Sequence, residues 1–147
     1  MEFDPATDYP IGERRPDLVL APDGTPLADI TLDAALAGDI DGASLRAAPE
    51  TLARQAAVAL AAGSEPLAAN LVRASEMTAL GDETILEIYT ALRPRRSTAD
   101  ELTAWADRLE HDHDAPVTAA FVREAAAVYA ARGLLRTAPG DRAVVGP

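Results

Sequence analysis

The stretch ILEIYTALRPRRST, from Ile85 to Thr98, decides the fold class of this chain. Its apolar residues recur at i, i+3, i+4 and i+7, the spacing that places one stripe on a single helix face. They are Ile85, Ile88, Tyr89 and Leu92. Pro94 cannot continue a helix, and it disfavours helical backbone at the residue before it. The stretch therefore predicts an amphipathic helix that ends abruptly.

The residues on both sides of Pro94 predict a surface turn and a new helix. Arg93, Arg95 and Arg96 gather where the helix dipole is negative. Thr98 and Glu101 have the spacing of a capping box, which opens the next helix. The hydroxyls of Ser97 and Thr98 have no histidine base nearby in the sequence, and the segment has no metal-binding cluster. We therefore interpret it as a segment for packing and surface charge.

The composition predicts a single domain with a thin core. The chain has 147 residues, of which 48% are hydrophobic and only 4% aromatic. Much of the hydrophobic content is alanine, so each helix can bury only a modest apolar area. We expect such a domain to gain stability from a partner.

The charge excludes several function classes. The formal net charge is −11 and the pI is near 4.5, so the chain would repel nucleic acid and anionic membranes. It has no cysteine, which excludes disulfides, thiolate metal sites and a cysteine nucleophile. We see no secretory signal and no apolar stretch long enough to span a bilayer, and expect a soluble, intracellular protein.

The chain divides into three parts by composition. Residues 1–30 are rich in Pro, Asp and Gly and predict an extended N-terminal arm with turns. A disordered tail is the alternative, but the apolar residues of this part favour an arm laid along another surface. Residues 31–136 carry the helical domain. Residues 137–147, with two prolines and two glycines, predict a flexible tail.

Helix signals follow one another through the central part. We expect helices from Thr31 to about Leu36, from Asp41 to Arg46, from Pro49 to Gly63 and from about Pro116 to Arg132. Three more are expected between them: one that ends before Gly81, one that begins at Asp82 and one that begins at Thr98. In the last of these, Val117, Phe121, Ala125, Val128 and Tyr129 are predicted to face inward. Strand signals are nearly absent. The fold is predicted to be all-α, a compact bundle of about six or seven short helices.

The only concentrated titratable cluster is EHDHD, from Glu110 to Asp114. His111 and His113 could bind a metal together with a carboxylate, which would make the protein a free-standing metal-dependent hydrolase. Residues two apart lie on different sides of a helix, however, and this cluster falls at a predicted helix end. A solvated polar helix end is therefore the preferred interpretation.

The three arginines could hold a phosphate or carboxylate, or could serve only to compensate the helix dipole. We favour an intermediate interpretation in which one or more of them pair with acidic groups of a partner. Acid pairs such as Asp100 with Glu101 fall in first helical turns, where negative charge is favourable, so no acid–base role is needed. Phosphate-binding glycine loops are missing.

Several blocks of sequence, taken together and in order, resemble one family. They are DYP (8–10), RRPD (14–17), DITLDAALAG (29–38), PETLARQA (49–56), ILEIYTALRP (85–94), RST (96–98) and AAFVREAA (119–126). The chain is similar to the small (gamma) subunits of adenosylcobalamin-dependent diol and glycerol dehydratases. The departures include Arg95, where the family pattern leads us to expect an aromatic residue.

The resemblance implies a structural role in a larger enzyme. It implies large and medium partner subunits, a dimer of heterotrimers, and adenosylcobalamin held between the large and medium subunits. The complex would convert a 1,2-diol or glycerol to an aldehyde by radical chemistry in the large subunit, so no catalytic, cofactor or metal residue is expected here. We expect a subunit interface that includes Tyr9, Tyr89, Arg93, Arg95, Arg96, Trp105 and Phe121.

Two questions stay open at this point. The chain begins close to the DYP block, without the N-terminal extension that in some relatives is associated with bacterial microcompartments. Cytoplasm and microcompartment lumen are therefore both possible locations. A helical adaptor that belongs to no enzyme is the remaining alternative function.

Overall fold

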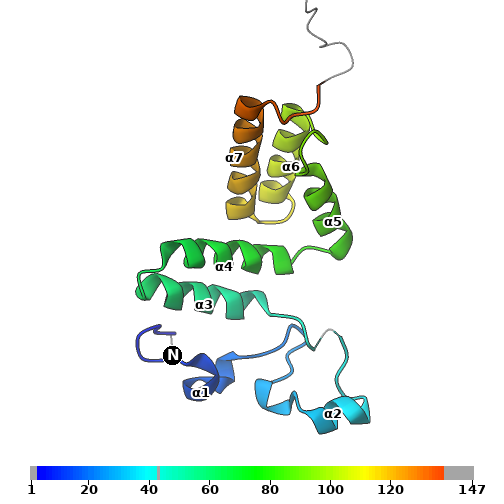
Figure 1. The fold of residues 1–147 in the computed structure, drawn as a ribbon. Coiled ribbons are helices and arrows are strands. Elements are labelled where there is room, and N and C mark those ends of the chain that lie inside the picture. Colours follow the sequence, from blue (N-terminus) through cyan, green and yellow to red (C-terminus); the bar gives the residue numbers. More distant parts are fainter. Residues whose placement is uncertain (1–2, 43, 138–147) are drawn as a thin grey trace, which may run out of the picture. The chain divides into compact units, whose positions relative to one another are not determined.

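The computed structural model describes residues 3–42 and 44–137, and its contacts divide the chain into two compact units (Figure 1). The first unit is Met1–Ala79 and the second is Leu80–Pro147. Within the described residues the first unit contains α1 (Ile11–Arg14), α2 (Leu32–Ala37), α3 (Pro49–Ala61) and α4 (Glu65–Thr78), and the second contains α5 (Asp82–Ala91), α6 (Ala99–His111) and α7 (Pro116–Arg132). The all-α class is confirmed.

The first unit is built on a hairpin of α3 and α4. Gly63, at φ 77°, makes the turn between them, because only glycine adopts this left-handed conformation without strain. Small residues, Ala56, Ala59 and Ala68, are buried in this unit and let helices approach closely. The Ser75 hydroxyl donates to the carbonyl of Pro49 at 2.8 Å, which joins the end of α4 to the start of α3.

The N-terminal arm is more structured than an extended segment. It contains α1 and two short 3-10 turns, Pro16–Leu18 and Leu27–Asp29. The Arg54 guanidinium of α3 donates to the carbonyl of Leu18 at 2.6 Å, and Ile11 is buried. Part of the apolar content of the arm is thus covered by its own unit. Whether the arm also lies along another protein stays a prediction.

The helix α2 has the predicted ends. The Thr31 side chain accepts from the backbone N–H of Ala34 at 3.1 Å, and Gly38 ends the helix at φ 82°. A helix from Asp41 to Arg46 was also expected, and this was wrong for the described residues there, which form turns. Asp41 does accept from the N–H of Ser44, but this cap closes a turn that no helix continues.

The second unit has its core between α6 and α7. Leu102, Ala106 and Leu109 form the buried face of α6, and all three are 0% exposed. They face the buried Ala119 and Val122 of α7 across the α6–α7 hairpin. Burial of each leucine side chain contributes about 1.5–3 kcal/mol, so this small core is what holds the unit together.

The inward face expected for α7 was largely wrong. Val117, Phe121 and Val128 are exposed, whereas Thr118, Ala119 and Val122 are buried. The reason is that α7 is apolar on nearly all sides, so hydrophobic periodicity does not choose between its faces. Packing chose the face with smaller residues, which can approach α6 more closely.

The helix starts and stops of the second unit follow the sequence signals closely. The capping box of Thr98 and Glu101 opens α6, and Gly133, at φ 64°, ends α7. Asp82 is the first residue of α5 instead of its cap, which is Gly81. Among the described helices, none combines the length and the apolar character that crossing a bilayer requires. The predicted tail lies outside the described residues from position 138 onward.

Candidate functional site

Residues 93–97 lie in the loop between α5 and α6 and are held by several hydrogen bonds, and we call them the arginine loop. The N–H of Arg95 donates to the carbonyl of Leu134 at 2.7 Å, and the N–H of Arg136 donates to the carbonyl of Ser97 at 2.8 Å. The buried Ser97 hydroxyl donates to the carbonyl of Ala91 at 2.9 Å. These bonds fix the loop backbone against α5 and against the segment after α7.

Arg95 adopts a strained backbone conformation in this loop. Its φ is 62°, in the left-handed region that costs a residue with a side chain free energy relative to glycine. The side chains of Arg93, Arg95 and Arg96 are all exposed. Unlike Arg15, Arg123 and Arg136, these three have no ion pair with any residue that the structure describes. The loop therefore presents three guanidinium groups to solvent on a protein of net charge −11.

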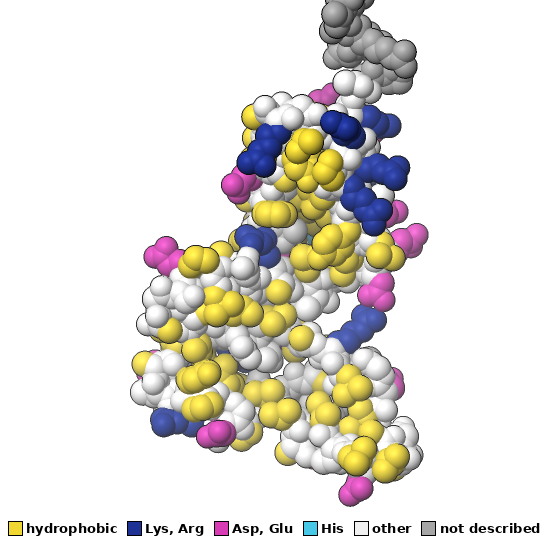
Figure 2. Space-filling view, in the orientation of Figure 1, with side chains coloured by type: hydrophobic (Ala, Val, Ile, Leu, Met, Phe, Trp, Pro, Cys, Tyr) yellow, Lys and Arg dark blue, Asp and Glu magenta, His cyan; other side chains and the backbone are white. Residues whose placement is uncertain are grey.

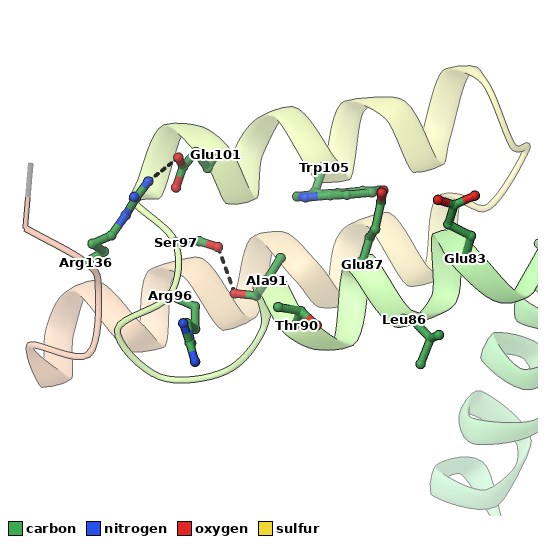
Figure 3. Close-up of a pocket in the computed structure, with 10 residues that line it drawn as sticks. All are labelled: Glu83, Leu86, Glu87, Thr90, Ala91, Arg96, Ser97, Glu101, Trp105 and Arg136. Carbon is green, nitrogen blue, oxygen red and sulfur yellow. Dashed lines mark hydrogen bonds and ion pairs between the residues drawn. The ribbon is translucent and has the colours of Figure 1, made fainter.

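A groove of about 660 Å³ lies beside this loop in the second unit (Figure 3). It is lined by Glu83, Leu86, Glu87, Thr90 and Ala91 of α5, by Arg96 and Ser97 of the loop, by Glu101 and Trp105 of α6, and by Arg136. Figure 3 shows Glu83 and Glu87 towards one end and Arg136 towards the other. Glu83 and Glu87 thus lie towards one end of the groove, whereas the other end holds Arg136 with its partner Glu101. Trp105 lies between the two ends.

Glu101, in the first turn of α6, forms an ion pair with Arg136 at the edge of the groove. The Glu101 carboxylate accepts from the backbone N–H of Thr98 at 2.8 Å and is paired with the Arg136 guanidinium. The Thr98 hydrogen bond first, and the Arg136 pair second, lower the pKa of Glu101 below its ordinary value. Glu101 therefore stays charged when it fixes Arg136 at the rim.

Trp105 is held in place by a neighbouring cation. The guanidinium of Arg108 lies 4.2 Å from the centroid of the Trp105 ring, a cation–π distance. The indole is partly exposed, so it has apolar surface left for a further contact. Together with the charged ends, this groove suits binding of a segment that carries both charges and an apolar side chain.

Two of the groups that could do chemistry, Ser97 and His111, make hydrogen-bonding contacts with backbone carbonyls. The Ser97 hydroxyl donates its hydrogen bond to the Ala91 carbonyl, and no histidine lines the groove. Nδ1 of His111 lies 2.8 Å from the carbonyl of Asp107 on its own helix. Within residues 3–42 and 44–137, no three His, Cys, Asp or Glu side chains cluster as metal ligands. The metal-dependent hydrolase alternative thus finds no support in the arrangement.

The residues expected at a subunit interface lie in different places. Arg96 and Trp105 share the groove, and Arg93 and Arg95 share the loop with Arg96. Tyr89 and Phe121 are exposed on α5 and α7, outside the groove lining. Tyr9 lies in the first unit, on a mostly apolar pocket of about 510 Å³ beside α3 and α4.

Sequence reasoning missed part of this site. Arg136 belongs to the groove because of the turn after α7, which returns the chain to the arginine loop. The acidic Glu83 and Glu87 have the i, i+4 spacing of one helix face, so their common direction could have been inferred. That they share a groove with Arg96 and Arg136 depends on the tertiary structure. Figure 2 shows apolar side chains and arginines gathered on the surface of this unit.

Comparison with known proteins identifies the class. Residues 5–136 match the model of the dehydratase small subunit family, and the chain belongs to that family. It is 48% identical over 130 residues to the propanediol dehydratase small subunit of Citrobacter freundii, a match that covers 88% of this chain and 76% of the relative. It is 46% identical over 130 residues to the propanediol dehydratase small subunit of Salmonella typhimurium, covering 88% and 75% of the two chains.

Proposed function

We propose that this chain is the small structural subunit of an adenosylcobalamin-dependent diol dehydratase, which converts a 1,2-diol to an aldehyde and water. The identity of 48% over 88% of the chain to a propanediol dehydratase small subunit carries this proposal. The names of both relatives favour propane-1,2-diol over glycerol as the substrate of the complex. We place the radical chemistry in the large subunit, and the complex in the cytoplasm or a microcompartment lumen.

The partners in this proposal are the large and medium subunits, assembled as a dimer of heterotrimers. We assign contacts with them to the arginine loop and to the exposed Tyr9, Tyr89, Trp105 and Phe121. Exposed arginines without internal partners support an acidic surface on the partner, because guanidinium and carboxylate groups form bidentate pairs. The partly exposed aromatic rings support an apolar contact beside it.

We assign no adenosylcobalamin contact to the described residues of this chain. His111 lies at the exposed C-terminal end of α6, His113 lies two residues further on, and neither lines any of the described pockets. The proposal therefore assigns the cofactor to the boundary between large and medium subunits. No chemical step is assigned to a side chain of this chain.

The test is reconstitution. The large and medium subunits are expressed with and without this chain, and aldehyde formation from propane-1,2-diol and from glycerol is measured after cofactor addition. We expect the three subunits to co-elute in gel filtration and activity to depend on this chain. Full activity without it, or no association with either partner, would disprove the structural role.

The arginine loop is tested separately by Arg96→Glu. The matched control is Arg132→Glu, which makes the same charge change at an exposed position of α7. We expect the loop variant to bind the other subunits about tenfold more weakly, since a lost charged pair is replaced by repulsion. Equal binding by the two variants would place the interface elsewhere.

A further inference from the structure

The helix α7 has a second apolar stripe on the side away from its buried face, and we call it the α7 seam. Its members follow i, i+3, i+4, i+7, i+10, i+11 and i+14, and all are exposed. They are Val117, Ala120, Phe121, Glu124, Ala127, Val128 and Ala131. Six of these seven are apolar over about four turns. A helix that is apolar on all sides is normally covered on all sides.

The residue sizes in the seam suit a packed helix. Alanines at 120, 127 and 131 alternate with the larger Val117, Phe121 and Val128. Small residues let another backbone approach, while the larger side chains fill the spaces between its ridges. An occupant with a regular helical surface therefore fits the seam better than an irregular loop.

Glu124 lies at the centre of the seam and decides the charge of the occupant. It has no ion pair with any residue that the structure describes, and the seam positions one turn away are apolar. The adjacent Arg123 does not neutralise it, because Arg123 is bound to Asp107 at 2.8 Å and Glu110 at 2.6 Å. An apolar helix packed here would bury an unpaired carboxylate unless it brought a positive charge.

The same carboxylate argues against a second copy of this chain. Glu124 is midway between Val117 and Ala131, so an antiparallel pair of identical seams would place the two Glu124 side chains opposite each other. Like charges at the centre of an apolar interface oppose its formation. A different chain, with an arginine or lysine at the matching position, has no such conflict.

We propose that the α7 seam binds a helix of another polypeptide, one with an apolar face and a central Arg or Lys that pairs with Glu124. This inference rests on the proposed function in one respect, since the helix is assigned to the large dehydratase subunit. The seam adds a specific site to that role, separate from the arginine loop.

The experiment compares Ala127→Glu with Ala130→Glu in the co-expressed complex. Both residues are exposed alanines of α7 that become glutamate, but Ala127 lies in the seam and Ala130 does not. We expect Ala127→Glu to weaken association with the large subunit about tenfold or more, and Ala130→Glu to bind as the wild type. Glu124→Arg should weaken it similarly and has little effect on helix propensity.

The outcomes separate the two proposals. If the wild-type chain co-elutes with the large subunit and Ala127→Glu and Glu124→Arg bind equally well, the seam proposal is overturned and the proposed function stands. If the wild type does not associate, both are overturned. If light scattering shows that the chain alone forms a dimer that Ala127→Glu dissociates, a second copy is the occupant and the proposal is wrong.

Discussion

The hydroxyl of Tyr129 donates to the backbone carbonyl of Leu92 at 2.6 Å, joining the last turns of α7 to the end of α5. Leu92 is the last residue before the arginine loop, and the same turn of α7 leads to Leu134, whose carbonyl accepts from Arg95. One bond from the last turns of α7 and one from the segment after it therefore hold the arginine loop, just before its start and at its centre. The loop geometry depends on α7 as much as on its own sequence.

Replacing Tyr129 by phenylalanine removes one of these bonds with little change in shape. We expect the free energy of unfolding to fall by about 1 kcal/mol, since the partly buried Leu92 carbonyl loses its side-chain partner. Urea denaturation followed by circular dichroism measures this change. Tyr89→Phe is the matched control, because Tyr89 is 58% exposed, and its effect should be within about 0.5 kcal/mol of zero.

Arg95 provides a test that separates backbone strain from side-chain function. Arg95→Gly and Arg95→Ala both remove the guanidinium, but only glycine is relaxed at φ 62°. The glycine variant should be more stable than the alanine variant by about 1 kcal/mol in urea denaturation. In the co-elution assay the two should be equally impaired. Equal stability would show that the loop relaxes without glycine, and unequal binding would mean that loop backbone geometry contributes.

The pH dependence of stability should contain a contribution from Glu101. Hydrogen bonding by Thr98 and pairing with Arg136 lower its pKa in the folded state, so the folded state binds this proton less readily than the unfolded state. The resulting stabilisation is present above the ordinary pKa of 4.5 and is lost as pH falls through the lowered value.

We therefore expect Glu101→Gln to reduce the acid-induced loss of stability, measured as the shift in urea midpoint between about pH 6 and about pH 3. At neutral pH the same variant should be less stable than the wild type. Glu83→Gln removes another carboxylate from the groove lining and serves as the control. An unchanged pH profile in Glu101→Gln would mean that the capping box and ion pair do not persist in solution.

The small core between α6 and α7 should be sensitive to a cavity. Leu102 is 0% exposed, so Leu102→Ala should lower the free energy of unfolding by about 2–5 kcal/mol. Leu86 is 66% exposed, and Leu86→Ala should cost less than about 1 kcal/mol. Similar losses in both variants, measured by thermal or urea unfolding, would contradict the packing described for this unit.

The sequence predicted where helices begin and end better than it predicted which of their faces are buried. Thr31 and Thr98 begin their helices and Gly38 and Gly133 end theirs, as expected. Caps and left-handed glycines are predictable because they act over only a few neighbouring residues. The helix predicted from Asp41 to Arg46 was wrong because a cap alone does not stabilise a helix. The apolar residues that follow the cap must also pack against another surface. The face of α7 could not be predicted, because alanine is nearly neutral between buried and exposed positions.

By itself, the sequence determined the all-α class, most helix ends and the family, since these depend on local backbone preferences and on the order of sequence blocks. Tertiary structure alone decided that Arg136 returns to the arginine loop and that Phe121 faces outward from α7. Both outcomes depend on close packing between segments distant in the sequence. Such packing selects among faces that hydrophobic spacing leaves nearly equal in free energy.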